Sequence, residues 1–178
     1  PKLPRRIGLV TSKHGDAVDD AIQSIHDRYP GIDITVAHAS VQGDDAIETI
    51  VTNVARLDEE TDADLIVVTR GGGADSTLRT FDELAVCRTI ARTDTPIAVG
   101  IGHENDETLA GRVADERIIT PTDAGALVPE RAALEQRLGT LEDRLTSAYR
   151  RQVTSQLETL ESCHEQAYER AVTEELHT

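Results

Sequence analysis

The sequence predicts an α/β fold, in which an open, mostly parallel sheet flanked by helices is followed by a long C-terminal coiled-coil helix. Short apolar runs alternate with helical patterns along the first part of the chain, which is typical of a parallel sheet. Residues 130–178 differ, because they contain one Gly, no Pro and Leu at coiled-coil spacing. We therefore expect an α/β domain over 1–128 and a helical arm over 129–178.

Four apolar runs are the expected strands. They are IGLVTS at 7–12, IDITVAHA at 32–39, LIVVT at 65–69 and IAVGI at 97–101. The first run is typical of a buried strand, and the alternation of all four runs with helical patterns is typical of an open parallel sheet. This pattern favours helices on both sides of the sheet.

Helical patterns occupy the segments between these runs. They cover 16–29, 44–57, 77–92 and about 105–114. In the first, Ala17, Ala21 and Ile25 share one face, and the Pro30-Gly31 pair breaks the helix. In the second, the apolar stripe contains Ile47, Ile50, Val51 and Val54.

The C-terminal segment predicts a helix about 70 Å long at 1.5 Å per residue. Its apolar seam has coiled-coil spacing and consists of Leu134, Leu138, Leu141, Leu145 and Ala148. A five-residue step, a local phase shift, then leads to Val153, Leu157, Leu160 and Cys163. A small domain cannot cover such a seam, so we expect another chain, including a second copy of this one, to pair with 130–178.

The charge composition is strongly acidic. The 33 Asp and Glu residues exceed the 18 basic residues by 15, and 16 of those 18 are Arg. Such a surface resembles that of proteins from extreme halophiles, since hydrated carboxylates keep a protein soluble in high salt. An acidic chain ordinarily binds nucleic acid poorly, but in molar salt the counterion-release contribution is weak for any protein.

Other features of composition bear on the setting of the protein. No run of 18 apolar residues is present, which excludes a transmembrane helix, and no signal segment opens the chain. The two cysteines, Cys87 and Cys163, indicate neither a disulfide framework nor a Cys-based zinc site, so we expect a reducing, cytoplasmic location. Because Met is absent even from position 1, we expect the chain to begin within a longer or processed product.

Polar residues follow the carboxyl ends of the expected strands, where ligands bind in open α/β sheets. The first strand ends in Thr11-Ser12, and the third ends beside Arg70. Gly71, Gly72 and Gly73 leave backbone N–H groups accessible to an anion, and a guanidinium grips phosphate oxygens with its planar fork. The pattern favours a phosphate site, although a bare triple Gly is equally compatible with a tight turn.

Further candidates are His103, which follows the fourth strand, and Asp106 three residues later. A carboxylate beside an imidazole fixes its tautomer, and such a His suits proton transfer to a leaving oxygen. Asp19 and Asp20 lie about 100° apart on the first helix, so only one can face the site; both are also typical of a solvated helix start.

No cluster of ligands in the sequence requires a metal ion. Asp20 and Asp106 could nevertheless share one such as Mg²⁺ in space. The remaining histidines are expected at the surface; they are His14, His26, His38, His164 and His177.

Several strings resemble the catalytic domain of the exonuclease VII large subunit family, in order over about 125 residues. They are LPRRIGLVTSKHGDAVDDAI at 3–22, VQGDDA at 41–46, TRGGG at 69–73 and VGIGHENDETLAGRVADERIITPT at 99–122. The helix after residue 130 resembles the start of the coiled-coil arm of that family. The family usually has Gly where this chain has Thr69, and its N-terminal oligonucleotide-binding domain has no counterpart here.

The resemblance implies an exodeoxyribonuclease that hydrolyses single-stranded DNA from both ends to oligonucleotides with 5′-phosphates. It places the essential residues of the family on Asp20, Arg70, His103 and Asp106. It also implies a small helical subunit along the arm, and no uniform need for a divalent metal. The alternative is a non-catalytic phosphate- or nucleotide-binding module that assembles through its helical arm.

Overall fold

The structure is a computed structural model that describes residues 3–13, 16–41, 43–70, 75–101 and 107–175. Its backbone contacts divide the chain into two units, residues 1–131 and 132–178.

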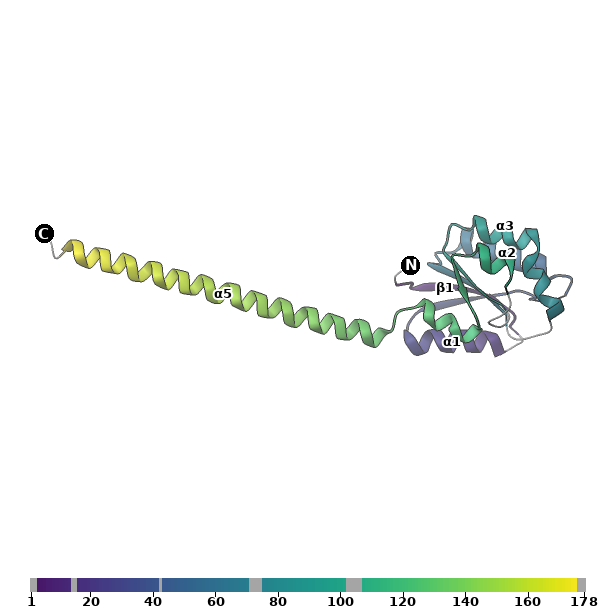
Figure 1. Ribbon diagram of the computed structural model, residues 1–178, viewed down its shortest axis with the longest axis horizontal. Coiled ribbons are helices and arrows are strands. Elements are labelled where there is room, and N and C mark those ends of the chain that lie inside the picture. Colours follow the sequence, from purple (N-terminus) through teal and green to yellow (C-terminus); the bar gives the residue numbers. More distant parts are fainter. Residues whose placement is uncertain (1–2, 14–15, 42, 71–74, 102–106, 176–178) are drawn as a thin grey trace. The chain divides into compact units, whose positions relative to one another are not determined.

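The first unit is built on a sheet of five parallel strands in the order β2-β1-β3-β4-β5 (Figure 1). The strands are β1 (Arg6–Thr11), β2 (Asp33–His38), β3 (Leu65–Arg70), β4 (Ile97–Ile101) and β5 (Glu116–Ile118). The predicted parallel sheet is confirmed, with four strands at the expected places. The fifth, β5, was not expected, because its sequence Glu-Arg-Ile contains only one apolar residue.

Helices cover both faces of this sheet (Figure 1). The α-helices are α1 (Asp16–Arg28), α2 (Ala46–Glu60), α3 (Leu84–Arg92) and α4 (Leu109–Val113), and the 3₁₀ helices are η1 (Asp75–Asp82) and η2 (Pro121–Leu127). The helix α1 and η2 pack on one face, whereas α2, α3 and α4 cover the other. The predicted arrangement with helices on both faces is therefore confirmed.

The expected continuous helix over 77–92 is wrong, because the segment consists of η1 followed by α3. Between them Glu83 is extended, with ψ at 136°. The buried side chains of Phe81 and Val86 lie five residues apart, which a single α-helix would turn to different faces. The break allows both side chains to enter the same core.

Alternation along the strands divides the core into two layers. Ile7 and Leu9 of β1 face α1 and η2, while Val10 faces α2 and α3. In β3, Val67 lies with the first layer and Val68 with the second. Because both sides of each central strand are buried, a one-residue slip in register would disrupt both layers at once.

Carboxylates hold the amino-terminal edge of the sheet. Asp64 accepts the backbone N–H groups of Arg5 and Arg6 at 2.8 and 3.0 Å, and these hydrogen bonds lower its pKa. Partial burial acts to raise the pKa of Asp58, but the N–H groups of Thr95 and Asp94 hold it below its ordinary value. Several of the acidic residues at this edge are thus used for structure.

The contact between α1 and η2 joins segments about a hundred residues apart. The Ser24 hydroxyl donates a hydrogen bond to the carbonyl oxygen of Thr122 and accepts one from the Gly125 N–H at 2.9 Å. Both Ala124 and Gly125 are buried in this contact. A single serine therefore fastens the segment after β5 to the first helix.

The second unit is formed by α5 (Arg131–Glu175). A continuous helix was predicted for the arm, and the structure confirms it. Five seam leucines are 48–71% exposed in the single chain; they are Leu138, Leu141, Leu145, Leu157 and Leu160. Whether a partner covers this seam stays a prediction.

We predict that Gly125→Ala destabilises the first unit by about 1–3 kcal/mol, because an added Cβ would lie only 2.5 Å from the backbone carbonyl oxygen of Ser24. Urea unfolding followed by circular dichroism measures the change. Gly139→Ala is the control, since nothing lies within 4 Å of its added Cβ and alanine favours a helix. An unfolding free energy for Gly125→Ala equal to that of the parent chain would contradict the close packing of α1 on η2.

Candidate active site

The carboxyl-terminal edge of the sheet is where the topology favours a ligand. In the strand order 2-1-3-4-5 the chain leaves β1 toward one side and β3 toward the other, and ligands bind at this switch point. The strands that flank it end in Thr11 and Arg70. Both residues were predicted to bind phosphate on sequence grounds.

Arg70 is the most unusual residue at this edge. Its side chain is only 3% exposed, although a guanidinium stays charged in proteins. By the alternation of β3 it lies on the same side as Ile66 and Val68, which belong to the core layer under α2 and α3. Burying such a charge has a considerable energetic cost, so Arg70 is a candidate ligand-binding residue at this edge.

Thr69, where the family usually has Gly, joins β3 to β4 at the same edge. Its hydroxyl is fully buried and donates a hydrogen bond to the carbonyl oxygen of Gly100 at 3.0 Å. Gly100 leaves room for β5, since an added Cβ would lie 2.5 Å from the Cγ1 atom of Ile118. The backbone next to Arg70 is therefore fixed on the β4 side by side-chain packing as well as by the strand ladder.

Thr11 carries a hydroxyl that is buried at the end of β1. Among the described residues, no group forms a hydrogen bond with its Oγ1 atom. Buried hydroxyls are normally paired, so an unpaired one beside the switch point is suited to an incoming polar ligand. Ser12, the next residue, is half-buried.

Asp20 lies on α1 and is exposed, as is Asp19. Asp20 borders a hollow of about 460 Å³ between α1 and η2, together with Ser24 and Thr122. The Thr122 hydroxyl lies 2.8 Å from that of Thr120. Sequence reasoning gave Ser24, Thr120 and Thr122 no role, and only the Pro121-Thr122 string within the family resemblance pointed to this segment.

Other predicted site residues lie outside the described residues. They are Gly71, Gly72, Gly73, His103 and Asp106. Convergence of His103 and Asp106 with Asp20 and Arg70 thus stays a prediction. Within the described ranges no three His, Cys, Asp or Glu side chains gather as metal ligands, and a shared ion at Asp20 and Asp106 is untested.

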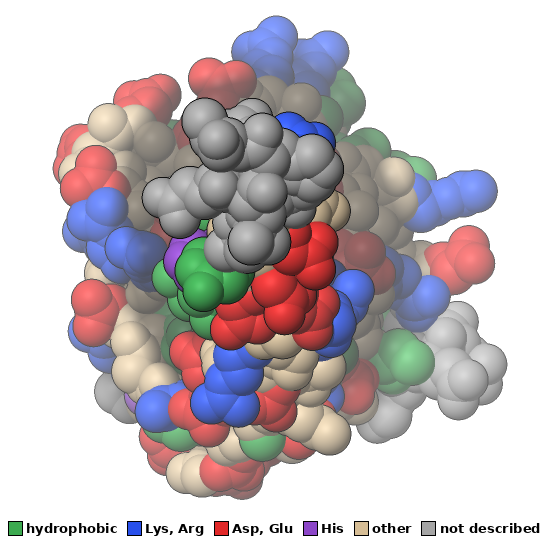
Figure 2. Space-filling model, turned by 90° about the vertical axis from the view of Figure 1, so that its left-hand side faces the viewer, with side chains coloured by type: hydrophobic (Ala, Val, Ile, Leu, Met, Phe, Trp, Pro, Cys, Tyr) green, Lys and Arg blue, Asp and Glu red, His purple; other side chains and the backbone are tan. Residues whose placement is uncertain are grey.

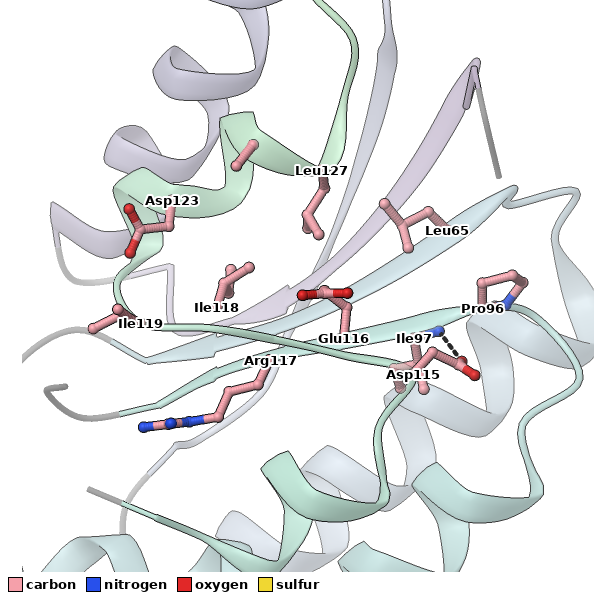
Figure 3. Close-up of a pocket in the computed structure, with 11 residues that line it drawn as sticks. Leu65, Pro96, Ile97, Asp115, Glu116, Arg117, Ile118, Ile119, Asp123 and Leu127 are labelled. Carbon is pink, nitrogen blue, oxygen red and sulfur yellow. Dashed lines mark hydrogen bonds between the residues drawn. The ribbon is translucent and has the colours of Figure 1, made fainter. Parts of the chain in front are cut away.

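A larger cavity, of about 630 Å³, lies beside β5 and has a different character (Figure 3). Leu65 and Ile97, which line it, are the first residues of β3 and β4, so it extends toward the amino-terminal edge of the sheet. Asp115 at its rim accepts the N–H of Ile97 at 2.9 Å, and Asp123 accepts the N–H of Thr120 at 2.8 Å. Because these carboxylates are engaged and Arg70 does not line the cavity, we place the candidate site at the carboxyl-terminal edge.

The surface agrees with the acidic composition. Figure 2 shows Asp and Glu side chains intermixed with Lys and Arg over the face that it draws. None of the helices in the described part of the chain has the length and hydrophobicity needed to span a membrane.

Comparison with known proteins places the chain in a family. The model of the family described as "Exonuclease VII, large subunit" matches residues 1–178. This chain belongs to the exonuclease VII large subunit family. The family that the sequence resembled is thereby confirmed, whereas the coiled-coil character of the arm stays a prediction.

Curated relatives agree with the family assignment. The exodeoxyribonuclease 7 large subunit of Listeria innocua is 39% identical over 151 residues, which are 84% of this chain and 34% of the relative. That of Streptococcus pneumoniae is 40% identical over 152 residues, with the same coverage. The chain thus spans about a third of the length of these relatives.

We predict that two threonine-to-valine substitutions at the carboxyl-terminal edge of the sheet affect different properties, one the stability of the fold and the other ligand binding. Thr69→Val should lower the unfolding free energy by about 1–3 kcal/mol, because it leaves the buried carbonyl of Gly100 without its donor. Thr11→Val should change stability little, since no described group bonds to its hydroxyl, but it should weaken binding of a 5′-phosphorylated oligonucleotide.

Urea unfolding and fluorescence anisotropy of a labelled oligonucleotide measure the two properties on the same preparations. If Thr11→Val destabilised the fold as much as Thr69→Val and left binding unchanged, a ligand-facing role for the Thr11 hydroxyl would be wrong.

Proposed function

We propose that the first unit is the nuclease domain of an exodeoxyribonuclease that hydrolyses phosphodiester bonds of single-stranded DNA from both ends. The observation that carries the proposal is the buried Arg70 at the switch point, followed directly in sequence by three glycines. Guanidinium and backbone N–H groups together suit a phosphate whose oxygens gain charge in the transition state. The relatives' name, exodeoxyribonuclease 7 large subunit, supports the same reaction.

Each site residue has a defined task in this proposal. Arg70 and the amides of the triple glycine hold the scissile phosphate. His103 exchanges a proton with the attacking water or the leaving oxygen, and Asp106 orients the imidazole. Asp20 positions the water, or a divalent ion such as Mg²⁺ where one is bound.

The proposed substrate must approach an acidic protein. The net charge of −15 repels DNA at low ionic strength. In molar salt, screening limits this repulsion to about 3 Å, so contacts within the site decide binding. We therefore propose that the domain works at high salt, in keeping with the halophilic composition and a cytoplasmic setting.

The test is degradation of single-stranded DNA in molar KCl, with substrates labelled at either the 5′ or the 3′ end, in the presence and absence of a chelator. Short products with 5′-phosphates, released from both labelled ends, are expected. Binding of oligonucleotides without any cleavage would instead favour the non-catalytic phosphate-binding alternative, which the names of the relatives do not favour.

We predict that His103→Ala lowers the cleavage rate by about 10²–10⁴-fold, the usual contribution of general acid–base catalysis. A residue beyond the end of a strand adds little to core packing, so the unfolding free energy should remain that of the parent chain. Single-turnover cleavage and urea unfolding on the same variant measure the two quantities. Near-normal cleavage would remove His103 from the proposed mechanism.

We also propose that α5 binds a helical partner along its seam: the family's small subunit or, in its place, a second copy of this chain. The seam leucines are exposed in the single chain, and burying each contributes about 1.5–3 kcal/mol. The family is named for a large subunit, which supports a smaller companion.

For this arm we predict that the chain alone self-associates and that Leu141→Glu with Leu145→Glu abolishes the association. Light scattering gives the mass, and circular dichroism shows whether the helix is retained. The matched control is Gln136→Glu with Thr146→Glu, which adds the same two negative charges at exposed positions of the helix away from the leucine seam. A monomeric parent chain whose helix melts at the same temperature as that of the leucine variant would mean that the seam has no partner.

A further inference from the structure

His38 occupies a position at the carboxyl-terminal edge that its sequence context did not reveal. It is the last residue of β2 and pairs in register with Thr11, the last residue of β1. The alternation of β2 puts it on the side of Ile34 and Val36, in the layer that faces α1. An exposed histidine thus stands directly beside the end of β1.

The imidazole of His38 forms a hydrogen bond to the turn that leaves β1. Its Nδ1 atom accepts the backbone N–H of Lys13 at 3.1 Å. A ring nitrogen accepts a hydrogen bond through its lone pair, so Nδ1 carries no proton in this arrangement. Because the N–H of Lys13 belongs to the planar peptide that it shares with Ser12, this one bond fixes the rotation of that peptide.

The backbone of His38 is itself fixed by hydrogen bonds with α2 and β1. The Asn53 side chain on α2 donates to the carbonyl oxygen of His38 at 2.9 Å and to that of Thr49 at 2.8 Å. The N–H of Ala39 donates to the Thr11 carbonyl at 3.0 Å, so the two strands remain paired up to this point. His38 therefore links the rigid end of β2 and α2 to the more exposed turn after β1.

We propose that His38 is a positioning residue for the phosphate site, acting by fixing the turn that presents the Ser12 hydroxyl and the Lys13 ammonium at the carboxyl-terminal edge. The side chain of Lys13 is exposed and lies two residues from the buried Thr11 hydroxyl. A lysine is a strong phosphate donor, but its affinity depends on where the backbone holds it. This inference rests on the proposed nuclease function and extends it to a residue outside the chemistry.

The test compares His38→Ala with His38→Asn. The Oδ1 atom of asparagine is the same number of bonds from Cα as the histidine Nδ1 and accepts hydrogen bonds, so it can replace the lost acceptor. The matched control is His26→Ala. His26 lies on α1, and its Nε2 atom is 3.0 Å from the backbone carbonyl oxygen of Ile32, which precedes the first residue of β2.

Two measurements decide the proposal. Amide hydrogen exchange at Lys13 should become about 2–10-fold faster in His38→Ala, the range expected for one neutral hydrogen bond, and should remain slow in His38→Asn and His26→Ala. In molar KCl, KM for a single-stranded oligonucleotide should rise by about the same factor in His38→Ala while kcat changes less, and His38→Asn should restore it.

Unchanged exchange at Lys13 in His38→Ala would overturn the proposal, as would an equal rise in KM in His26→Ala or a failure of His38→Asn to restore KM. Failure of the nuclease function is recognised separately, because the parent chain would then cleave no single-stranded DNA. If the parent chain is inactive, the proposed effect of His38 on KM is overturned as well. Amide hydrogen exchange at Lys13 then still decides whether His38 holds the turn.

Discussion

The guanidinium of Arg70 lies buried at the end of a central strand, and much of the carboxyl-terminal edge can be understood from that constraint. A buried charge is expensive unless dipoles or an opposite charge surround it in fixed positions. The strand that carries it is accordingly held on both sides, by β1 and by β4 with the Thr69 bond to Gly100. Rigid placement of the positive charge costs little further reorganisation when a phosphate binds.

The two edges of the sheet carry different polar groups. At the amino-terminal edge Asp58, Asp64 and Asp115 accept backbone N–H groups, so their charges serve to fix the starts of strands and loops. At the other edge the Thr11 hydroxyl is buried with no bond to a described residue, and Asp20 is exposed. In the proposed function, the Thr11 hydroxyl, unpaired among the described residues, is therefore suited to meet a phosphate ester at this edge.

Much of the fold follows from the apolar runs, because they are short, rich in Ile and Val and separated by helical patterns, which is typical of buried parallel strands. The prediction failed where tertiary contacts replaced local pattern. The polar strand β5 forms because it pairs with β4 and buries Ile118, and the helix expected over 77–92 breaks at Glu83 so that Phe81 and Val86 share one core. Neither event leaves a periodic signal in the sequence.

The same reasoning explains which parts of the site could be predicted. Thr11 and Arg70 were accessible to prediction because each ends an apolar run, and strand ends meet at one edge of a parallel sheet. The prediction that His38 lies at the surface is confirmed, but its bond to Lys13 could not be predicted, because only the register of β2 on β1 brings the two together. Ser24 and Thr122 lie 98 residues apart, and their contact depends on η2 packing against α1. Residues proposed to bind phosphate can be predicted from their type and their place at a strand end, whereas residues proposed to position them can be found only from the folded chain.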